Sequence, residues 1–237
     1  MNMEEEYECP FEFQELSEEE KKISAWFQTD LVKVRPTRTC APRLIKKFGK
    51  ELYNFKPRPD DIWLIGFPRS GTTLTQEILY LLGTDLDYEK AAGTIMDIRF
   101  PVLCFAMYKN QEDMEGIQHV CNDEVPIHKQ LEAVEGRRFI KSHYGFSFIH
   151  PKILDIGCKV VFIARNPKDV MVSRFYYPTY LNRPGHTFEK LWHIFKNDLL
   201  DTGNYFEMLN DAWQRRHNKI YYFCFMKKLK LIKKRLF

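Results

Sequence analysis

The chain has 237 residues, of which 44% are hydrophobic and 15% are aromatic. This content excludes disorder throughout the chain, and the length suits one sizeable core better than two domains. The formal net charge of +4 is a small basic excess and gives only weak support for a nucleic-acid partner. No apolar run approaches the roughly 20 residues that a membrane-spanning helix needs, so we expect no membrane partner.

The two ends of the chain carry opposite charge. The first twenty residues contain many glutamates and no lysine or arginine, and we interpret residues 1–35 as an acidic N-terminal extension with a solvated, frayed end. From Lys227 onward the chain carries six basic side chains and no acid, which is typical of a helix with a solvated basic face. The acidic start does not resemble a secretory signal, and the six cysteines are dispersed without metal-ligand spacing. These features predict a reduced, cytoplasmic protein.

The expected elements alternate between strands and helices. Residues 34–59 are rich in Pro, Arg and Lys and read as an irregular lead-in with one short helix near 43–48. An apolar strand at 61–67 precedes a helix at 72–82, which Gly83 closes. Further strands are predicted at 138–141, 159–164 and 219–225, and further helices at 148–156 and 169–177. This alternation predicts an α/β single domain with a central parallel sheet flanked by helices.

The loop after the first of these strands has the pattern of a phosphate site. Residues 66–73 read Gly-Phe-Pro-Arg-Ser-Gly-Thr-Thr, which is similar to the P-loop sequence G-x-x-x-x-G-K-[ST]. A loop between strand and helix directs backbone N–H groups and the helix dipole at an anion. Thr72 stands where nucleotide kinases and ATPases carry lysine, so magnesium-dependent triphosphate chemistry is disfavoured. The simpler alternative is a strand-to-helix turn with a capping Ser and Thr.

Three segments together resemble the cytosolic sulfotransferase family. Residues 67–73 (F-P-R-S-G-T-T) are similar to its 5′-phosphosulfate loop P-K-S-G-T-T-W, and residues 139–143 (F-I-K-S-H) to its catalytic K-[ST]-H. Residues 164–173 (A-R-N-P-K-D-V-M-V-S) are similar to its 3′-phosphate segment R-N-x-K-D-x-x-x-S. The resemblance implies transfer of a sulfuryl group from 3′-phosphoadenylyl sulfate (PAPS) to a hydroxyl or amine. The expected acceptor is a phenol, a steroid or another small alcohol.

The resemblance also implies roles for the matching residues. His143 is expected to be the general base, because imidazole titrates near working pH, while Lys141 and Arg69 stabilise charge on the transferring group. Arg165 can bind the 3′-phosphate through two parallel hydrogen bonds, with Ser173 two helical turns later. The residues expected to hold PAPS are Arg69, Ser70, Gly71, Thr72, Thr73, Leu74, Arg165 and Ser173. The fixed cations supply the charge, so no metal is expected.

The acceptor side is implied by resemblance alone. Phe100, Pro101, Phe105 and Phe146 fall in segments that line the family's acceptor site, where they would make an apolar slot for the acceptor. Ordinary core packing remains open for each aromatic side chain. Likewise, His143 on its own is compatible with a structural histidine, and Arg165 with a surface ion pair to Asp169.

The chain departs from the family pattern at two positions and at its end. Arg69 replaces the usual lysine and Leu74 the usual tryptophan, which predicts altered donor positioning and weaker stacking on adenine. The family's late R-K-G segment and its dimerisation segment K-x-x-x-T-V have no counterpart here. We therefore expect residues 36–237 to be a sulfotransferase-like domain that is incomplete at its C-terminus and monomeric.

Other functions remain open from the sequence. The truncated pattern is compatible with a catalytically impaired sulfotransferase relic or a nucleotide-binding protein. A P-loop kinase or NTPase is a weaker alternative because of Thr72. A nucleic-acid module is weaker still, since the basic tail lacks interleaved aromatic side chains.

Overall fold

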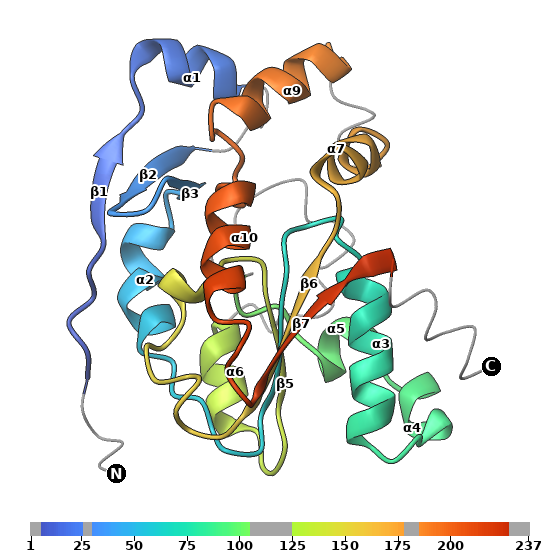
Figure 1. The fold of residues 1–237 in the computed structure, drawn as a ribbon. Coiled ribbons are helices and arrows are strands. Elements are labelled where there is room, and N and C mark those ends of the chain that lie inside the picture. The colour runs from blue at the N-terminus through green and yellow to red at the C-terminus, as the bar shows by residue number, and fades with distance from the viewer. Residues whose placement is uncertain (1–5, 26–29, 105–124, 178–184, 228–237) are drawn as a thin grey trace.

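The computed structural model describes residues 6–25, 30–104, 125–177 and 185–227, and it contains two sheets (Figure 1). An antiparallel sheet comprises β1 (Glu12–Glu15), β2 (Leu31–Arg35) and β3 (Thr39–Pro42). A parallel sheet has the spatial order β5-β4-β6-β7 and comprises β4 (Ile62–Ile65), β5 (Phe139–Ser142), β6 (Lys159–Ala164) and β7 (Tyr221–Phe225). The parallel sheet confirms the fold class that the sequence predicts.

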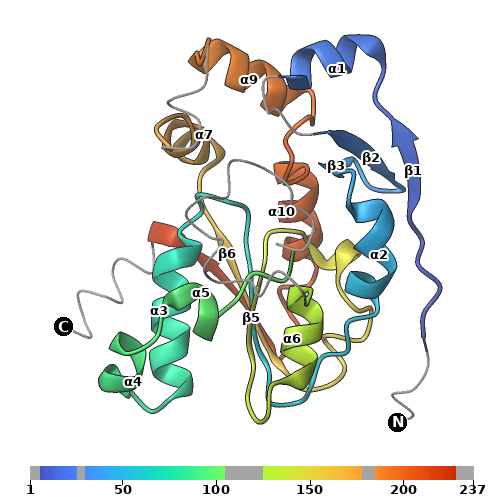
Figure 2. The ribbon, with the colours of Figure 1, turned by 180° about the vertical axis from the view of Figure 1, so that it is seen from behind.

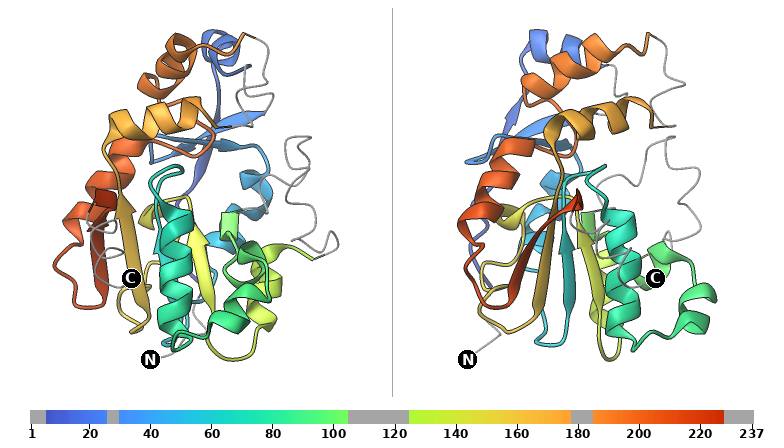
Figure 3. Two further views of the ribbon diagram at one scale, coloured as in Figure 1. Left: turned by 90° about the vertical axis from the view of Figure 1, so that its right-hand side faces the viewer. Right: turned by 45° about the vertical axis from the view of Figure 1, so that its right-hand side comes forward.

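Helices cover both faces of the parallel sheet, as Figures 2 and 3 show. On one side lie α3 (Thr72–Gly83), α4 (Tyr88–Ala92) and α5 (Met96–Arg99). On the other side lie α2 (Ile45–Tyr53), α6 (Ile127–Ala133), α10 (Tyr205–Gln214) and the short 3₁₀ helix η4 (Phe146–Phe148). The remaining helices, α1 (Glu18–Ser24), α7 (Pro167–Phe175) and α9 (Phe188–Lys196), lie beyond the end of this sheet where the phosphate-loop segment leaves β4.

Strand β4 shows how the sequence directs this layering. All four of its residues are buried, and alternate side chains enter different clusters. Trp63 and Ile65 join the large core under α2 and α10, whereas Ile62 and Leu64 join the smaller core under α3. Because neighbouring residues of a strand point to opposite faces, an uninterrupted apolar run fits a strand that is covered on both sides.

The described residues 6–25 and 30–59 contain strands and helices, so the expectation of an irregular lead-in is wrong, whereas the expected frayed end falls on residues 1–5, outside the described residues. Strand β1 pairs with β2, and β2 pairs with β3 across a Pro-containing turn. Val32 and Val34 are fully buried, and Glu15 forms ion pairs with Arg43 and Lys46. The alternating Leu-Val-Lys-Val-Arg of β2 carries this strand signal, which the surrounding prolines and charges obscure. Helix α2 also extends well past the short helix expected near 43–48.

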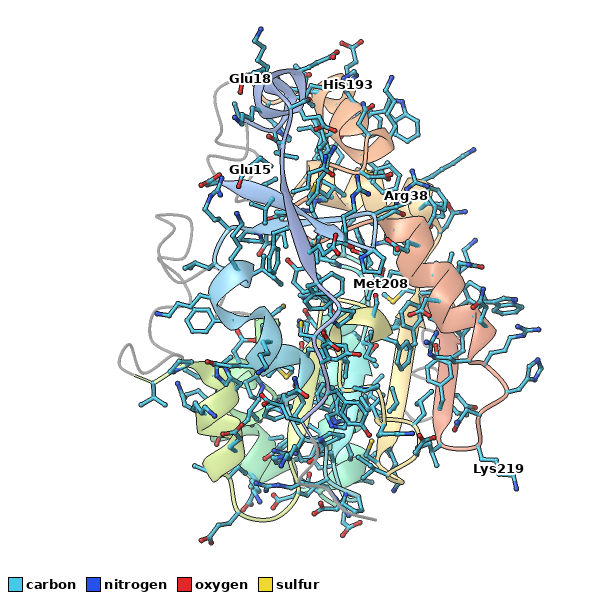
Figure 4. All side chains as sticks on the ribbon, turned by 90° about the vertical axis from the view of Figure 1, so that its left-hand side faces the viewer. Glu15, Glu18, Arg38, His193, Met208 and Lys219 are labelled. Carbon is cyan, nitrogen blue, oxygen red and sulfur yellow. The ribbon has the colours of Figure 1, made fainter. Side chains whose placement is uncertain are left out.

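The acidic segment packs along the molecule instead of extending from it. In Figure 4, Glu15 lies on the antiparallel sheet, and Glu18 and His193 mark α1 and α9, which contact each other. The proposed boundary at residue 35 falls at the end of β2, whose partner β3 lies on the other side of that boundary. The division into an extension and a domain stays a prediction.

The prediction of a helix at 148–156 is wrong. The chain instead forms η4 and then a series of turns, with Ile153 N donating to His150 O at 3.0 Å and Asp155 N to Lys152 O at 2.9 Å. Pro151 explains this, because proline has no N–H to donate and disfavours helical backbone in the preceding residue. The other helices and strands predicted between residues 61 and 225 occur within a few residues of their expected ends.

The predicted basic helix at the C-terminus falls largely on residues 228–237, which lie outside the described residues. Among the helices that the structure describes, none combines the length and apolarity required to cross a bilayer.

Candidate functional site

The loop between β4 and α3 places two glycines where side chains would not fit. A Cβ atom on Gly66 would lie 2.6 Å from Ile163 Cγ2 and 2.9 Å from Thr72 Cγ2, so the loop leaves β4 in close contact with β6 and α3. Gly71 has a φ of 99° and precedes the first residue of α3. Left-handed backbone at this point suits glycine and turns successive N–H groups toward the helix N-terminus. The loop therefore has the geometry that the phosphate-site prediction requires.

The hydroxyl of Ser70 is buried within this loop without a hydrogen-bond partner. Ser70 has no exposed surface, and its Oγ contacts no acceptor or donor among the described residues. The start of α3 has no side-chain capping hydrogen bond, so neither Ser70 nor a Thr of the loop caps the helix in this structure. A buried hydroxyl without a partner costs free energy, so its presence beside the helix N-terminus fits a ligand oxygen.

The residues predicted to bind the 3′-phosphate adjoin the loop. Arg69 Nε donates to Ser173 Oγ at 3.2 Å, and Arg165 Nη1 donates to the Arg69 carbonyl at 2.9 Å. The Arg69 guanidinium also lies 4.6 Å from the ring centre of Tyr177. Tyr205 donates its hydroxyl to the Arg165 carbonyl and so anchors the end of β6. In the described part of the chain, Arg165 makes this contact to Arg69 and no ion pair with Asp169.

Lys141 is a buried cation on β5, beside β4. Its Nζ donates to Gln76 Oε1 on α3 at 3.0 Å, and Gln76 Nε2 donates to the Phe100 carbonyl at 2.8 Å. Burial lowers the pKa of Lys141 to about 8, while the nearby Asp97 carboxylate opposes the shift. The ammonium group is therefore charged at neutral pH but has lost most of its hydration. Such a group interacts strongly with a developing negative charge.

His143 follows β5 and is held in one tautomer. Its Nδ1 lies 2.7 Å from the Gly66 carbonyl oxygen. Because a carbonyl oxygen only accepts hydrogen bonds, Nδ1 carries the proton and Nε2 keeps its lone pair. Burial and, to a lesser extent, the Lys141 ammonium lower the pKa of His143 to about 3. The ring is thus neutral at physiological pH, in the form that a general base requires.

An apolar cavity lies beside the end of β5. It is a small space, partly open to solvent, between β5, α2 and η4. The lining residues are Phe11, Ile45, Gly49, Leu52, Leu103, Cys104, Ser142, Tyr144 and Phe148. Burial raises the pKa of the Cys104 thiol to about 11, so this group is a neutral part of the wall. Its mostly apolar lining would favour an uncharged group over an ion.

Of the residues predicted to contact the acceptor, those that the structure describes are not among the residues that line this cavity. Phe100 has no exposed surface and packs on Phe139 with ring centres 5.4 Å apart, in the core under α3. Pro101 accepts the Lys141 N–H at 2.9 Å, and Phe146 packs on Tyr221 with ring centres 5.4 Å apart. These contacts are core contacts, and Phe105 lies outside the described residues. The acceptor role of these four residues stays a prediction.

Several residues of the site escaped the sequence reading. Gln76, Tyr177 and Tyr205 have no motif signal, and only the fold brings them to the predicted residues. Tyr144 directly follows the K-S-H segment and Phe148 lies five residues after His143, a proximity that could have indicated them. Thr73 is exposed and Leu74 partly exposed at the start of α3, next to the loop. Their predicted contacts with the donor remain predictions.

Together, these elements bring most of the predicted donor-site and catalytic residues to one end of the parallel sheet. The ends of β4, β5 and β6 contribute, respectively, the phosphate loop, Lys141 with His143, and Arg165. Among the described residues, no group of three His, Cys, Asp or Glu side chains is placed to hold a metal ion. The class of protein defined so far is an α/β protein with a P-loop-like site for a phosphorylated ligand.

Comparison with known proteins identifies the family. A family model for the sulfotransferase domain matches residues 59–232, and the chain belongs to this family. It is 31% identical to human Sulfotransferase 4A1 over 169 residues, which is 70% of this chain and 53% of that protein. The chain thus spans about half the length of the curated relatives that it matches.

The structural neighbours agree with the family. A retinol dehydratase structure with retinol and PAP has a TM-score of 0.81 at 31% identity, covering 94% of this chain and 71% of that one. A second, with androsterone and the inactive cofactor PAP, has a TM-score of 0.83 at 32% identity, covering 96% and 73%. The predicted membership of the sulfotransferase family is therefore confirmed.

Proposed function

We propose that this chain transfers a sulfuryl group from PAPS to the hydroxyl of a small lipophilic acceptor. The observation that carries the proposal is the convergence of three strand ends on one site. The loop after β4 offers the Ser70 hydroxyl and the α3 N-terminus, while β5 supplies Lys141 and His143. Arg165 and Ser173 approach the same loop through Arg69, as two ends of a bisphosphorylated nucleotide require.

The residues suit the chemical step. Neutral His143 accepts the acceptor's hydroxyl proton at Nε2 as the oxygen bonds to sulfur and the bond from sulfur to the phosphate oxygen breaks. The leaving group is adenosine 3′,5′-bisphosphate (PAP), whose released oxygen gains negative charge. Lys141 stabilises that charge, since its ammonium is already desolvated. Negative phosphates nearby raise the pKa of both groups, which strengthens His143 as a base and keeps Lys141 protonated.

The cavity supports a lipophilic acceptor. Its wall is mostly aromatic and aliphatic, and it includes Ser142, which lies between Lys141 and His143 in the sequence. The neighbouring retinol dehydratase structures hold retinol and androsterone, both alcohols with large apolar bodies. We therefore expect retinoid-like and steroid-like alcohols to be better acceptors than small polar alcohols. An amine acceptor is a weaker alternative, because a protonated amine is disfavoured in an apolar cavity.

The test uses the purified chain with sulfur-labelled PAPS and a panel of retinol, androsterone, phenol and ethanol, in the presence of a metal chelator. The account expects labelled sulfate ester, more of it from the lipophilic alcohols, and inhibition by added PAP. Folded protein that binds PAP but transfers no label to any acceptor would support the alternative of a nucleotide-binding protein. Chelator-sensitive hydrolysis of ATP would support a kinase or NTPase instead.

The oligomeric state and the location of the protein in the cell are also proposals. The match covers only 53% of human Sulfotransferase 4A1, so the activity is proposed for this chain and is to be measured on it directly. We propose a monomeric, cytoplasmic protein. A sedimentation measurement and fractionation of cells would test these two points.

A further inference from the structure

One buried glutamine contacts both the catalytic lysine and the backbone beside it. Gln76, on the second turn of α3, is 1% exposed, and its two amide atoms serve different partners. Its Oε1 accepts from Lys141 Nζ at 3.0 Å, while its Nε2 donates to the Phe100 carbonyl at 2.8 Å. These contacts are not part of any of the motifs that indicated the site.

The two partners fix the direction of the amide. The Lys141 ammonium only donates hydrogen bonds and the Phe100 carbonyl only accepts them. A glutamine meets both demands at once, whereas a glutamate would place a carboxylate oxygen against the Phe100 carbonyl. An aliphatic side chain would leave both partners buried and unpaired, at a cost in free energy.

We propose that Gln76 is a positioning residue, which holds the Lys141 ammonium in place and couples it to the segment that begins at Phe100. The inference rests on the proposed function, because it assigns a role toward Lys141 in sulfuryl transfer. Gln76 does not reach the reacting atoms itself. It acts by directing the Lys141 proton donors and by supplying the side-chain oxygen that compensates the buried charge.

The surroundings link this contact to both sides of the site. Gln76 lies on the helix whose N-terminus follows the phosphate loop, so α3 connects the donor loop with Lys141. On the other side, Lys141 N donates to Pro101 O, and Val102 bridges to Lys141, so residues 100–102 run along β5. Beside Gln76, Glu77 pairs with Arg99 at 2.6 Å and fixes the start of that segment on α3.

Other titratable groups also act on Lys141. Asp97 on α5 favours its charged form, as does the Cys104 thiol when ionised, and His143 lies close enough to experience the lysine charge. None of these is changed by a substitution at Gln76. A shift in Lys141 titration that follows the chemistry at position 76 therefore reports on the amide contact.

The experiment compares Gln76→Glu, Gln76→Met and Gln76→Asn with matched changes at Gln130. Gln130 is a suitable control because its Nε2 also donates to a backbone carbonyl, that of Val125 at 2.6 Å, on a different helix. Two quantities are measured for each folded variant. One is the Lys141 pKa, followed by NMR of the lysine Cε signals and assigned with Lys141→Arg, and the other is the high-pH limb of kcat/KM for sulfuryl transfer.

Gln76→Glu is expected to raise the Lys141 pKa and its activity limb by about 1 unit or more, and Gln76→Met to lower both by a similar amount. Gln76→Asn is too short to reach both partners, so it is expected to shift the pKa in the same direction as Gln76→Met by less. Gln130→Glu and Gln130→Met are expected to leave both quantities unchanged. An unchanged Lys141 pKa in folded Gln76 variants, or shifts of one sign for Glu and Met, would overturn the inference.

The two readouts separate this inference from the proposed function. If the NMR pKa shifts as expected but the wild-type chain transfers no sulfate, the amide contact stands and the proposed function fails. If transfer occurs while neither the NMR pKa nor the activity limb moves, the positioning role fails and the proposed function stands. If Gln76→Glu or Gln76→Met does not fold, Gln76→Asn is the mildest of the three changes and serves for the same measurement.

Discussion

Arg69 of the phosphate loop donates a hydrogen bond to Ser173 of α7, with 3.2 Å between Nε and Oγ. The two residues are 104 positions apart, and this contact joins the loop after β4 to the helix after β6. Arg69 has a φ of 70°, a left-handed conformation that is uncommon for arginine and directs its side chain toward α7. The predicted 5′- and 3′-phosphate sites are thus connected before any donor binds.

This contact predicts that Arg69 contributes to donor binding through charge. Arg69→Met is expected to weaken PAP binding about tenfold or more, since hydrogen bonds to charged groups contribute about 1.5–3 kcal/mol. Ser173→Ala is expected to weaken it less, because the guanidinium remains, and Arg69→Lys should stay within a few-fold of wild type. Calorimetric titration with PAP measures this. Arg35→Met, whose arginine contacts Gln14 on the antiparallel sheet, is the control. Unchanged affinity in Arg69→Met contradicts the assignment.

Substitution of Gly71 by alanine is expected to lower stability for two separable reasons, backbone strain and a steric clash. Its φ of 99° is almost matched by the 98° of Gly157, but a Cβ at Gly71 would lie 2.1 Å from Met226 Sδ, whereas Gly157 faces open space. Gly157→Ala should therefore lower the free energy of unfolding by about 1–2 kcal/mol from backbone strain alone. Gly71→Ala should lower it further and abolish PAP binding.

The second substitution that tests this pair is Met226→Ala. In the Gly71→Ala background it should recover the part of the stability loss that comes from the steric clash. Denaturant unfolding measures each difference. Equal losses for Gly71→Ala and Gly157→Ala would mean that the thioether contact carries no energetic weight.

The buried Lys141 is expected to cost stability in the absence of donor. Its pKa falls from 10.5 to about 8 on folding, so between these values the unfolded chain binds more protons than the folded one. Stability contributed by this group therefore rises as pH increases from 8 toward 10.5. Lys141→Met should remove this rise and raise the free energy of unfolding near pH 7 by about 2 kcal/mol, while abolishing transfer.

Thermal unfolding of the two proteins at pH 7 and pH 10 tests this expectation. The difference between Lys141→Met and wild type should be larger at pH 7 than at pH 10. A variant that is less stable than wild type at pH 7 would show that the ammonium stabilises the donor-free fold.

The lowered pKa of His143 predicts an unusual acid limb in the pH profile of kcat/KM. Because its pKa is lowered to about 3, the ring of the donor-free protein stays neutral as pH falls from 8 to 5. The kcat/KM for PAPS is therefore expected to show no loss from His143 protonation above about pH 5. Bound phosphates raise the pKa, so the acid limb of kcat should lie at higher pH than that of kcat/KM. A kcat/KM limb near pH 6.5 would contradict the buried tautomer described here.

The strands and helices of the parallel sheet were predictable because their signals are local. The apolar run of β6 and the proline at the start of α7 need no distant contact to be interpreted. The antiparallel sheet was not predicted, since β2 depends on pairing with β1 and β3 and lies among prolines and charges. The turns at 151–156 show the converse, where a helix-like apolar spacing is overridden by Pro151.

The site divides in the same way. The predicted phosphate-loop residues, Lys141 and His143 lie in contiguous motifs, and the fold brings them together at the sheet end. Gln76 was hidden because one polar residue on an amphipathic helix has no pattern of its own. The cavity wall combines Phe11, Leu52 and Phe148 from distant segments, which no local spacing predicts.

The central claim is that His143 is the base of a sulfuryl transfer, and His143→Asn tests it most directly. The asparagine Nδ2 can still donate to the Gly66 carbonyl in place of His143 Nδ1, but it offers no basic nitrogen to the acceptor. PAP affinity and PAPS turnover are measured on the same folded preparation. The account predicts PAP affinity near that of wild type and turnover reduced about 100-fold or more. Turnover close to wild type would contradict it.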